Sequence, residues 1–527
     1  FLVYEDRELK EESIEAEFRT LLFREGKTEE ALKKAEEMIK LDESKPLSWF
    51  SKGLALGNLG RNEEALAAFS KAVELDPEFS LAWYDKGLAL RDLGRNEEAL
   101  AAFSKAIELD PEFDFAWYGK GTALGNLGRH EEALAAFSKA VELNPEFGLA
   151  WYSKGLALRD LGRHEEALAA FSKAVELNPK FGLAWHGKGV ALRDLGRHEE
   201  ALAAFSKAVE LDPEFSLAWY DKGLALRDLG RYEEALAAFS KAVELNPKFG
   251  LAWYGKGLAL GNLGRYEEAL AAFSKAVELN PKFGLAWCDK GAALGNLGRH
   301  EEALEAFSKA IELNPEFSLA WYGKGAALGN LGRHEEALEA FSKAVELNPE
   351  FSLAWYGKGA ALGNLGRYEE ALAAFSKAVE LAPEQAHFWH LKGEVHLMIS
   401  LREFNKSNYG NALENLNSAL EAFNAFSTHS KSEESKKRVN EGLMAFMMRL
   451  IDTKNVKAVE MALLALFEKN KELRELFEPI HIAVEIVKSK DVNRYYELQV
   501  EIRELVAEIV KKLTGSEELL PEEYRSR

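Results

Sequence analysis

Hydrophobic and polar positions recur along most of this chain with a period of 34 residues. Within one period, Trp253, Gly257 and Leu260 have the spacing i, i+4 and i+7, which is one face of a helix. The following segment, YEEALAAFSKAVEL, places Ala269 and Phe273 on one face of a second helix. Acidic residues favour its first turn, and an Asn-Pro step ends it. Each period therefore predicts two antiparallel helices joined by short turns.

Tryptophan and proline mark this period. The eleven tryptophans of the chain follow one another at steps of 34 residues, and ten prolines from Pro77 to Pro383 keep the same step. One segment of the period, WYGKGLALGNLG, is rich in glycine, as a phosphate-binding loop is. A P-loop, however, occurs once after a buried strand, and the spacing GxxxxGK[ST] is absent from the repeats. A fixed period in this range instead predicts stacked helical units.

The repeated positions resemble the tetratricopeptide repeat family. The family's fixed Trp, Gly, Leu or Tyr, Gly, Ala, Phe, Ala and Pro correspond here to Trp253, Gly257, Leu260, Gly264, Ala269, Phe273, Ala276 and Pro281. Lys256 stands where the family usually has leucine, and its methylene stem is expected to cover apolar surface. The resemblance implies an all-α, right-handed superhelical solenoid of helix pairs, with the first helices lining its concave side.

The repeat pattern predicts four parts. Residues 1–45 are expected to form an N-terminal helical cap with a degenerate repeat, and residues 46–385 form ten tandem repeats. Residues 386–429 form a twelfth repeat with an insertion, because its equivalent alanine, Ala412, comes seven residues late. Residues 430–527 form a non-repeat helical region, which is predicted to be a C-terminal cap or, alternatively, a partner-docking region.

The last amphipathic segment of the chain has apolar residues at alternating steps of four and three. These residues are Leu498, Ile502, Leu505, Ile509 and Leu513. The seam lasts barely two heptads, so it predicts the inner face of a packed helix rather than a coiled coil.

Composition narrows the function classes. The net charge of −20 argues against a nucleic-acid partner, which needs a basic surface. The single cysteine, Cys288, excludes an internal disulfide framework and suits a reducing compartment. No apolar run is long enough for a membrane span, so no membrane insertion is predicted. The chain begins with Phe1, so we expect a fragment or a processed product; a cytoplasmic location is favoured, and an extracellular one stays open.

A second apolar stripe on the first helix is not needed for the core. Leu251, Tyr254 and Leu258 form it in one repeat, and the family resemblance directs it into the concave groove. Tyrosine occupies the middle of this stripe at Tyr84, Tyr118, Tyr152, Tyr220, Tyr254, Tyr322 and Tyr356. We expect these rings to contact a bound chain, since tyrosine gives contact area at low entropy cost. The alternative is that they only pack on the neighbouring repeat.

The end of the first helix divides the predicted groove into two kinds of segment. One kind has glycine followed by asparagine, and its candidate site residues are Gly261, Gly329, Asn262, Asn296, Asn330 and Asn364. The other kind has arginine followed by aspartate, at Arg91, Arg159, Arg193 and Arg227. Neither Gly255 nor Gly261 is expected in the core, so an extended chain could approach a glycine floor and pair with asparagine. Alternatively, Asn and Asp only end the helix.

Five histidines share one position at the start of the second helix. They are His130, His164, His198, His300 and His334. Stacked repeats separate them too far to converge on a metal, so they are predicted to be solvated turn residues. No catalytic grouping stands out from the repeats, so no enzyme, cofactor or metal site is predicted.

The sequence therefore predicts a non-enzymatic scaffold that binds an extended peptide or a partner helix in its concave groove. One alternative is a self-associating structural solenoid that builds a fibre or tube, because repeated surfaces allow contacts that do not close. Another is a sensor or scaffold segment of a larger enzyme whose catalytic domain precedes Phe1. The expected partner is a protein or peptide, or further copies of the chain.

Overall fold

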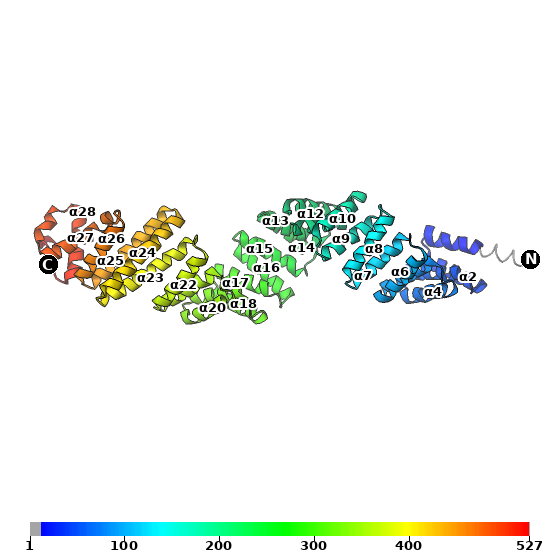
Figure 1. Cartoon of the computed structure of the whole chain (residues 1–527), viewed down its shortest axis with the longest axis horizontal. Coiled ribbons are helices and arrows are strands. Elements are labelled where there is room, and N and C mark those ends of the chain that lie inside the picture. The colour runs from blue at the N-terminus through cyan, green and yellow to red at the C-terminus, as the bar shows by residue number, and fades with distance from the viewer. Residues whose placement is uncertain (1–11, 526–527) are drawn as a thin grey trace, which may run out of the picture. The chain divides into compact units, whose positions relative to one another are not determined.

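The computed structural model describes residues 12–525, in which helices are joined by short turns and no strand occurs (Figure 1). The chain divides into two compact units, one ending at Leu263 and the other beginning at Gly264. Within residues 12–525, every helix is too short or too polar to traverse a bilayer.

The first unit consists of consecutive helix pairs. After a helical segment over residues 12–19, its elements are the π-helix η1 (Thr20–Arg24), α2 (Thr28–Leu41), α3 (Pro46–Asn58), α4 (Asn62–Leu75), α5 (Ser80–Asp92), α6 (Asn96–Leu109), α7 (Asp114–Asn126), α8 (His130–Leu143), α9 (Gly148–Asp160), α10 (His164–Leu177), α11 (Gly182–Asp194), α12 (His198–Leu211), α13 (Ser216–Asp228), α14 (Tyr232–Leu245) and α15 (Gly250–Asn262). From α3 onward, odd numbers are first helices and even numbers are second helices of the repeats.

The second unit continues the pairs and ends in helices without the period. Its elements are α16 (Tyr266–Leu279), α17 (Gly284–Asn296), α18 (His300–Leu313), α19 (Ser318–Asn330), α20 (His334–Leu347), α21 (Ser352–Asn364), α22 (Tyr368–Leu381), α23 (Ala386–Asn405), α24 (Tyr409–Ser430), α25 (Glu433–Asp452), α26 (Val456–Lys469), α27 (Leu473–Ser489), the 3-10 helix η2 (Val492–Glu497), α28 (Val500–Thr514) and the 3-10 helix η3 (Glu522–Tyr524). The all-α prediction and the predicted helix pairs are confirmed.

The tryptophan of each repeat ties its first helix to the preceding turn. Trp83 Nε1 donates a hydrogen bond to the carbonyl of Pro77 over 2.9 Å. The ammonium of Lys86 lies 4.9 Å from the centroid of the Trp83 ring, and a lysine takes this place over all eleven tryptophans. The lysine at the family's usual leucine position therefore adds a cation–π contact to the apolar cover expected of its stem.

In several repeats, the phenylalanine of the second helix packs between two glycines, one from each of two successive first helices. A Cβ placed on Gly87 would lie 2.7 Å from the ring of Phe103, and one placed on Gly119 of the next repeat would lie 2.6 Å from the same ring. The expectation that Gly255 lies outside the core is therefore wrong, because a Cβ there would lie 2.6 Å from Phe239. The first helix of each such repeat approaches the preceding repeat so closely that only hydrogen fits.

The first helices lie on the inner side of the curve within each unit. First helices of neighbouring repeats contact each other, as α5 contacts α7 and α19 contacts α21. Among the described helices, neighbouring second helices do not contact each other to the same extent. The surface that faces inward is therefore built from first helices, as the family resemblance implies.

The two ends of the repeat array are closed differently. At the N-terminal end, Ile14, Phe18 and Leu22 are buried in one cluster with residues of α2 and α3. The role of residues 1–45 as a cap stays a prediction, and its residues 1–11 lie outside the described range. In the twelfth repeat, α23 has 20 residues where α21 has 13. The seven additional residues are about two helical turns, so the buried face keeps its direction.

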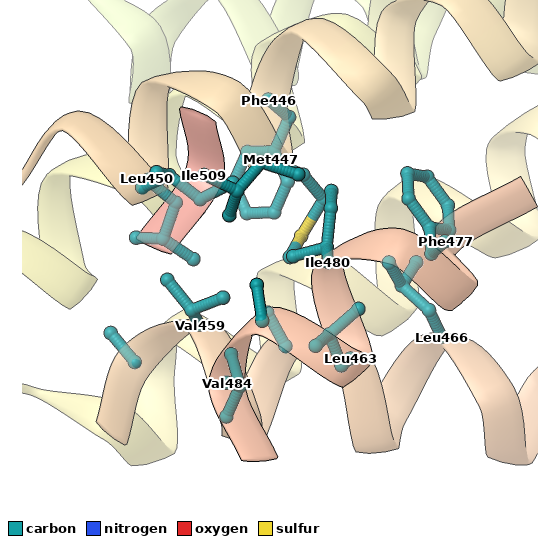
Figure 2. Packing of buried hydrophobic residues seen from close by; sticks show 14 of the residues in the cluster. Phe446, Met447, Leu450, Val459, Leu463, Leu466, Phe477, Ile480, Val484 and Ile509 are labelled. Carbon is teal, nitrogen blue, oxygen red and sulfur yellow. The ribbon is translucent and has the colours of Figure 1, made fainter. Parts of the chain in front are cut away.

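Helices α25 to α28 pack with α23 and α24 around one hydrophobic cluster. Figure 2 shows how Phe446, Met447 and Leu450 of α25 meet residues of α26, α27 and α28. Residues from Leu397 to Leu520 belong to this cluster. Residues 430–525 therefore have a larger common core than any single repeat, while their role as cap or docking region stays a prediction.

The seam expected in the last amphipathic segment is partly wrong. Leu498 precedes α28, and Leu505 is 43% exposed. Ile509 and Leu513 are buried as predicted, and Val506 and Val510 are buried with them. The expected seam began two residues before the helix does, and η2 interrupts the helical register there.

Candidate binding surface along the first helices

An exposed apolar residue occupies the same position near the start of every first helix from α3 to α21. Its exposed fraction lies between 36% and 51%. In the first unit these residues are Leu47, Leu81, Phe115, Leu149, Leu183, Leu217 and Leu251, and in the second unit they are Leu285, Leu319 and Leu353. We call them the leucine row. It is the outer edge of the apolar stripe predicted from Leu251, Tyr254 and Leu258.

The tyrosine rings of the stripe pack between repeats. The ring centroid of Tyr84 lies 5.8 Å from that of Phe103 in its own repeat and 5.0 Å from that of Phe113 in the following turn. Tyr118, Tyr152, Tyr220 and Tyr322 pack on two phenylalanines in the same way, and Tyr356 packs on Phe375, Phe388 and His387. Tyr254 occupies the same position in α15. The packing alternative therefore holds for the rings.

Within the described part of the chain, the hydroxyls of most of these tyrosines, unlike their rings, are not used in packing between repeats. Burial raises the pKa of Tyr84 to about 12, and it also raises the pKa of Tyr322. Within residues 12–525, the hydroxyls of Tyr84, Tyr118, Tyr152, Tyr220, Tyr322 and Tyr356 make no hydrogen bond to the protein, nor are they fully buried. Each of these hydroxyls therefore keeps one donor and its acceptor lone pairs for another molecule.

Two of the candidate glycines leave open space at the end of the first helix. A Cβ placed on Gly261 or Gly329 would meet nothing within 4 Å. In contrast, a Cβ on Gly323 of the same helix as Gly329 would lie 2.3 Å from Phe307. Gly329 therefore differs from the core glycines of α19, since nothing inside the protein requires its small size.

The asparagines beside these glycines are exposed at the helix end. Asn262 donates a hydrogen bond to the carbonyl of Leu258 over 2.9 Å, and Asn296 donates one to that of Ala292 over 3.0 Å. Asn330 and Asn364 hold the same positions in α19 and α21. The bonds of Asn262 and Asn296 support the alternative in which asparagine helps to end the helix.

Three of the four candidate arginines bond the aspartate that follows them. Arg91, Arg159 and Arg227 reach Asp92, Asp160 and Asp228 at 2.8, 3.1 and 2.8 Å. This agrees with the paired charges expected from the sequence. The fourth, Arg193, points instead to the next repeat.

Arg193 belongs to a partly buried ionic cluster that sequence reasoning missed. Its Nη1 lies 2.6 Å from Oδ1 of Asp221, and Nε2 of His186 lies 2.7 Å from Oδ2 of the same carboxylate. Asp221 is only 6% exposed. Arg193 lies 28 residues before Asp221, which is six short of a period, and His186 lies 35 residues before it, which is one past a period. A search for opposite charges at these offsets would have found the cluster.

The histidines at the start of the second helix are less solvated than predicted. Nδ1 of His164 lies 3.6 Å from Oδ2 of Asp194 in the next repeat. Nδ1 is buried without a hydrogen-bond partner in His164, His198, His300 and His334. One ring nitrogen is therefore shielded from water, while about a third of the His164 side chain stays exposed. Within residues 12–525, no three His, Cys, Asp or Glu side chains are grouped to hold a metal ion.

A family model described as tetratricopeptide repeat matches the chain in overlapping segments. They are residues 20–78, 50–112, 118–180, 158–215, 186–248, 220–282, 288–350 and 327–386. No curated protein matches the chain.

Several solved structures are similar to parts of the chain. The crystal structure of YrrB, described as a TPR protein with an unusual peptide-binding site, is 31% identical over 36% of this chain and 98% of its own, with a TM-score of 0.33. MamA from Desulfovibrio magneticus RS-1 is 27% identical over 32% of this chain and 96% of its own, with a TM-score of 0.31. The APC/C hetero-tetramer Cut9-Hcn1 is 16% identical over 82% of this chain and 96% of that chain, with a TM-score of 0.43.

Proposed function

This chain belongs to the tetratricopeptide repeat family, and we propose that it is a non-enzymatic scaffold that binds an extended peptide of a partner protein along its first helices. The leucine row is the observation that carries the proposal. Scattered exposed leucines are ordinary on a protein surface, but a row at one position of ten successive first helices is not scattered.

The chemistry beside the leucine row suits a peptide. The hydroxyls of tyrosines such as Tyr322 retain hydrogen-bonding capacity next to apolar surface, and a peptide offers both amides and side chains. The open surface at Gly329 would let a backbone come close to the helix. Recognition along such a surface joins apolar contacts, which give affinity, with polar contacts, which fix the register.

The test uses the full chain and a random library of nine-residue peptides. Peptides selected on the parent protein are titrated against the double variant Leu319→Glu/Leu353→Glu, which places charges in the leucine row. We expect its affinity to fall at least about tenfold, since two apolar contacts are lost. Circular dichroism should show an unchanged helical spectrum, because both side chains are exposed.

A matched control lies on the second helices. Ala271 of α16 is exposed, and the equivalent residues of the next two repeats, Glu305 and Glu339, are already glutamate. Ala271→Glu should therefore keep full affinity. Equal binding of the selected peptides by the leucine-row variant would overturn the proposal. Loss of self-association instead, seen by sedimentation over a dilution series, would favour the structural solenoid.

A further inference from the structure

Two first helices that contain an aspartate have the same sequence but different neighbours. The thirteen residues SLAWYDKGLALRD form both α5 and α13. Asp85 and Asp221 are therefore the same residue of the same helix, and any difference between them comes from the helices around them.

At Asp221 the preceding first helix, α11, supplies two partners. Arg193 and His186 bond the two carboxylate oxygens at 2.6 and 2.7 Å. A buried carboxylate needs such donors, because burial removes the water that would otherwise solvate its charge. Asp221 is thus satisfied from within the protein.

At Asp85 both partners are missing. The residues 28 and 35 positions before it in α3 are Gly57 and Phe50, which take the places of Arg193 and His186. The Phe50 ring packs on Phe69 and Phe79 at 5.8 and 4.9 Å, much as the His186 ring packs on Phe205 and Phe215 at 5.7 and 5.0 Å. Phe50 fills the same space as a histidine, but it has no N–H to donate.

The place of the arginine side chain is open. A Cβ placed on Gly57 would meet nothing within 4 Å. Within residues 12–525, the carboxylate of Asp85 makes no hydrogen bond or ion pair, and burial raises its pKa to about 7. The protein therefore holds a poorly solvated carboxylate beside the space that a guanidinium occupies at Asp221.

We propose that Asp85, Gly57 and Phe50 form a subsite that receives an arginine side chain of the bound peptide, in the place that Arg193 fills at Asp221. This subsite rests on the proposed peptide-binding function and gives it a chemical preference. The guanidinium bonds the carboxylate through its planar N–H groups, and it gives up water more readily than an ammonium does. The net charge of −20 favours approach of such a basic peptide.

The first experiment compares two peptides on the full chain. One is an eleven-residue peptide of leucine, serine and alanine with a central arginine, and the other has citrulline, its neutral analogue, in that place. The parent protein should bind the arginine peptide about tenfold more tightly, as expected for a hydrogen bond to a charged group. Asp85→Asn should remove the preference. Gly57→Arg should also remove it, because the new side chain occupies the subsite as Arg193 does.

A gain of function provides the converse test. The double variant His186→Phe/Arg193→Gly gives Asp221 the surroundings of Asp85. We expect this variant to bind one guanidinium group more than the parent does.

A second readout does not depend on peptide binding. The carbon-13 resonance of the Asp85 carboxyl, followed against pH, should show its pKa falling when N-acetylarginine methylamide is added to the parent. In Gly57→Arg the pKa should already be low and should not respond to the added compound. An unresponsive Asp85 in the parent overturns the subsite. If arginine and citrulline peptides bind equally, the subsite is wrong and the peptide-binding function stands. If neither binds, the library-selected peptides decide that function and the resonance alone decides the subsite.

Discussion

The repeat array and the C-terminal helices fill their cores in different ways. One repeat buries a small cluster made by adjacent helices, such as Leu328, Ala337, Ala340, Phe341 and Ala361. The C-terminal helices share one cluster of leucine, isoleucine, methionine and phenylalanine that draws on α23 to α28. Each repeat of the array depends on a single phenylalanine ring, which in five repeats (Phe103, Phe171, Phe239, Phe307 and Phe341) lies between two glycines. The C-terminal region depends instead on many large side chains that meet at a common centre.

This difference explains where a binding surface arises. A repeat touches only its neighbours, so each first helix keeps the same inner face uncovered and the leucine row results. The C-terminal helices turn their large apolar residues toward one another around a closed centre. The repeats therefore leave apolar residues exposed along their first helices, whereas the C-terminal helices bury most of theirs in one core.

The largest expected effect is on the two cores themselves. Phe477→Ala in α27 and Phe103→Ala in α6 each remove a fully buried ring, and each should cost about 3–5 kcal/mol of unfolding free energy. Hydrogen exchange should show protection lost across α25 to α28 for Phe477→Ala. For Phe103→Ala the loss should stay within α4 to α8, because contacts in the array are between neighbours. Equal loss at α11 and α13 would contradict the comparison.

Glycine gives the next largest effect. Gly323→Ala adds a methyl group 2.3 Å from the Phe307 ring, so overpacking should outweigh the better helix propensity of alanine and cost about 1–3 kcal/mol. Gly442 in α25 is also a helical glycine, but a Cβ there would meet nothing within 4 Å. Gly442→Ala should therefore raise stability by up to about 1 kcal/mol. Urea unfolding midpoints measure both changes, and a stabilised Gly323→Ala would show that the ring moves aside freely.

The fold of the array was predictable because one pattern is repeated. The tryptophan step fixed the helix pairs, and the turn before α6 follows from Gly94, whose φ of 75° favours glycine. The core position of Gly255 was not predictable, because a glycine carries no apolar side chain and periodicity alone does not reveal its closeness to Phe239. In the C-terminal region, amphipathic segments predicted helices, but without a period nothing indicated that α28 begins at Val500 rather than near Leu498.

The candidate site was predictable in position but not in detail. The sequence placed the leucines and tyrosines on one helix face, and they share that face in the structure. It did not pair Asp221 with Arg193, because that contact joins two repeats whose residues differ from the common pattern. Interactions within a repeat follow from its own sequence, whereas interactions between unlike repeats depend on which two happen to be neighbours.

The comparison extends to two single carboxylates, buried Glu403 and partly buried Asp85. Glu403 near the C-terminal core is bonded by Arg402, Lys406 and Asn408 at 3.0, 3.2 and 2.9 Å. Asp85 in the array has no such donors among residues 12–525. Burial raises the pKa of Asp85 to about 7 in the folded protein, whereas a free aspartate in the unfolded chain has a pKa of about 4. Ionisation of Asp85 therefore lowers the free energy of unfolding increasingly between about pH 4 and pH 7, and the whole loss is present above that range. Asp85→Asn should therefore stabilise the protein at pH 8 by about 1–2 kcal/mol, after allowance for solvent screening, and change nothing below pH 4.

The matched variant at the second copy of that helix should behave in the opposite way. Asp221→Asn leaves Arg193 partly buried without its counter-charge, so it should destabilise the protein at pH 8. Thermal unfolding at pH 4 and pH 8 separates the two variants. A destabilised Asp85→Asn at pH 8 would mean that Asp85 has a partner and is no open subsite.

Two tyrosine hydroxyls give the smallest effect. Tyr495 in the C-terminal region is fully buried, and its hydroxyl has no partner within the described residues, so Tyr495→Phe should raise stability by about 1 kcal/mol.

Tyr322 in the array also has an unbonded hydroxyl, but that hydroxyl is not fully buried and its ring packs on Phe341 and Phe351. Tyr322→Phe keeps the ring, so stability should change by less than about 0.5 kcal/mol. If the hydroxyl bonds a bound peptide, affinity for the library-selected peptides should still fall by about 1 kcal/mol, roughly fivefold. Unchanged affinity would leave Tyr322 with packing as its whole role, and the leucine row would then carry recognition in that repeat without it.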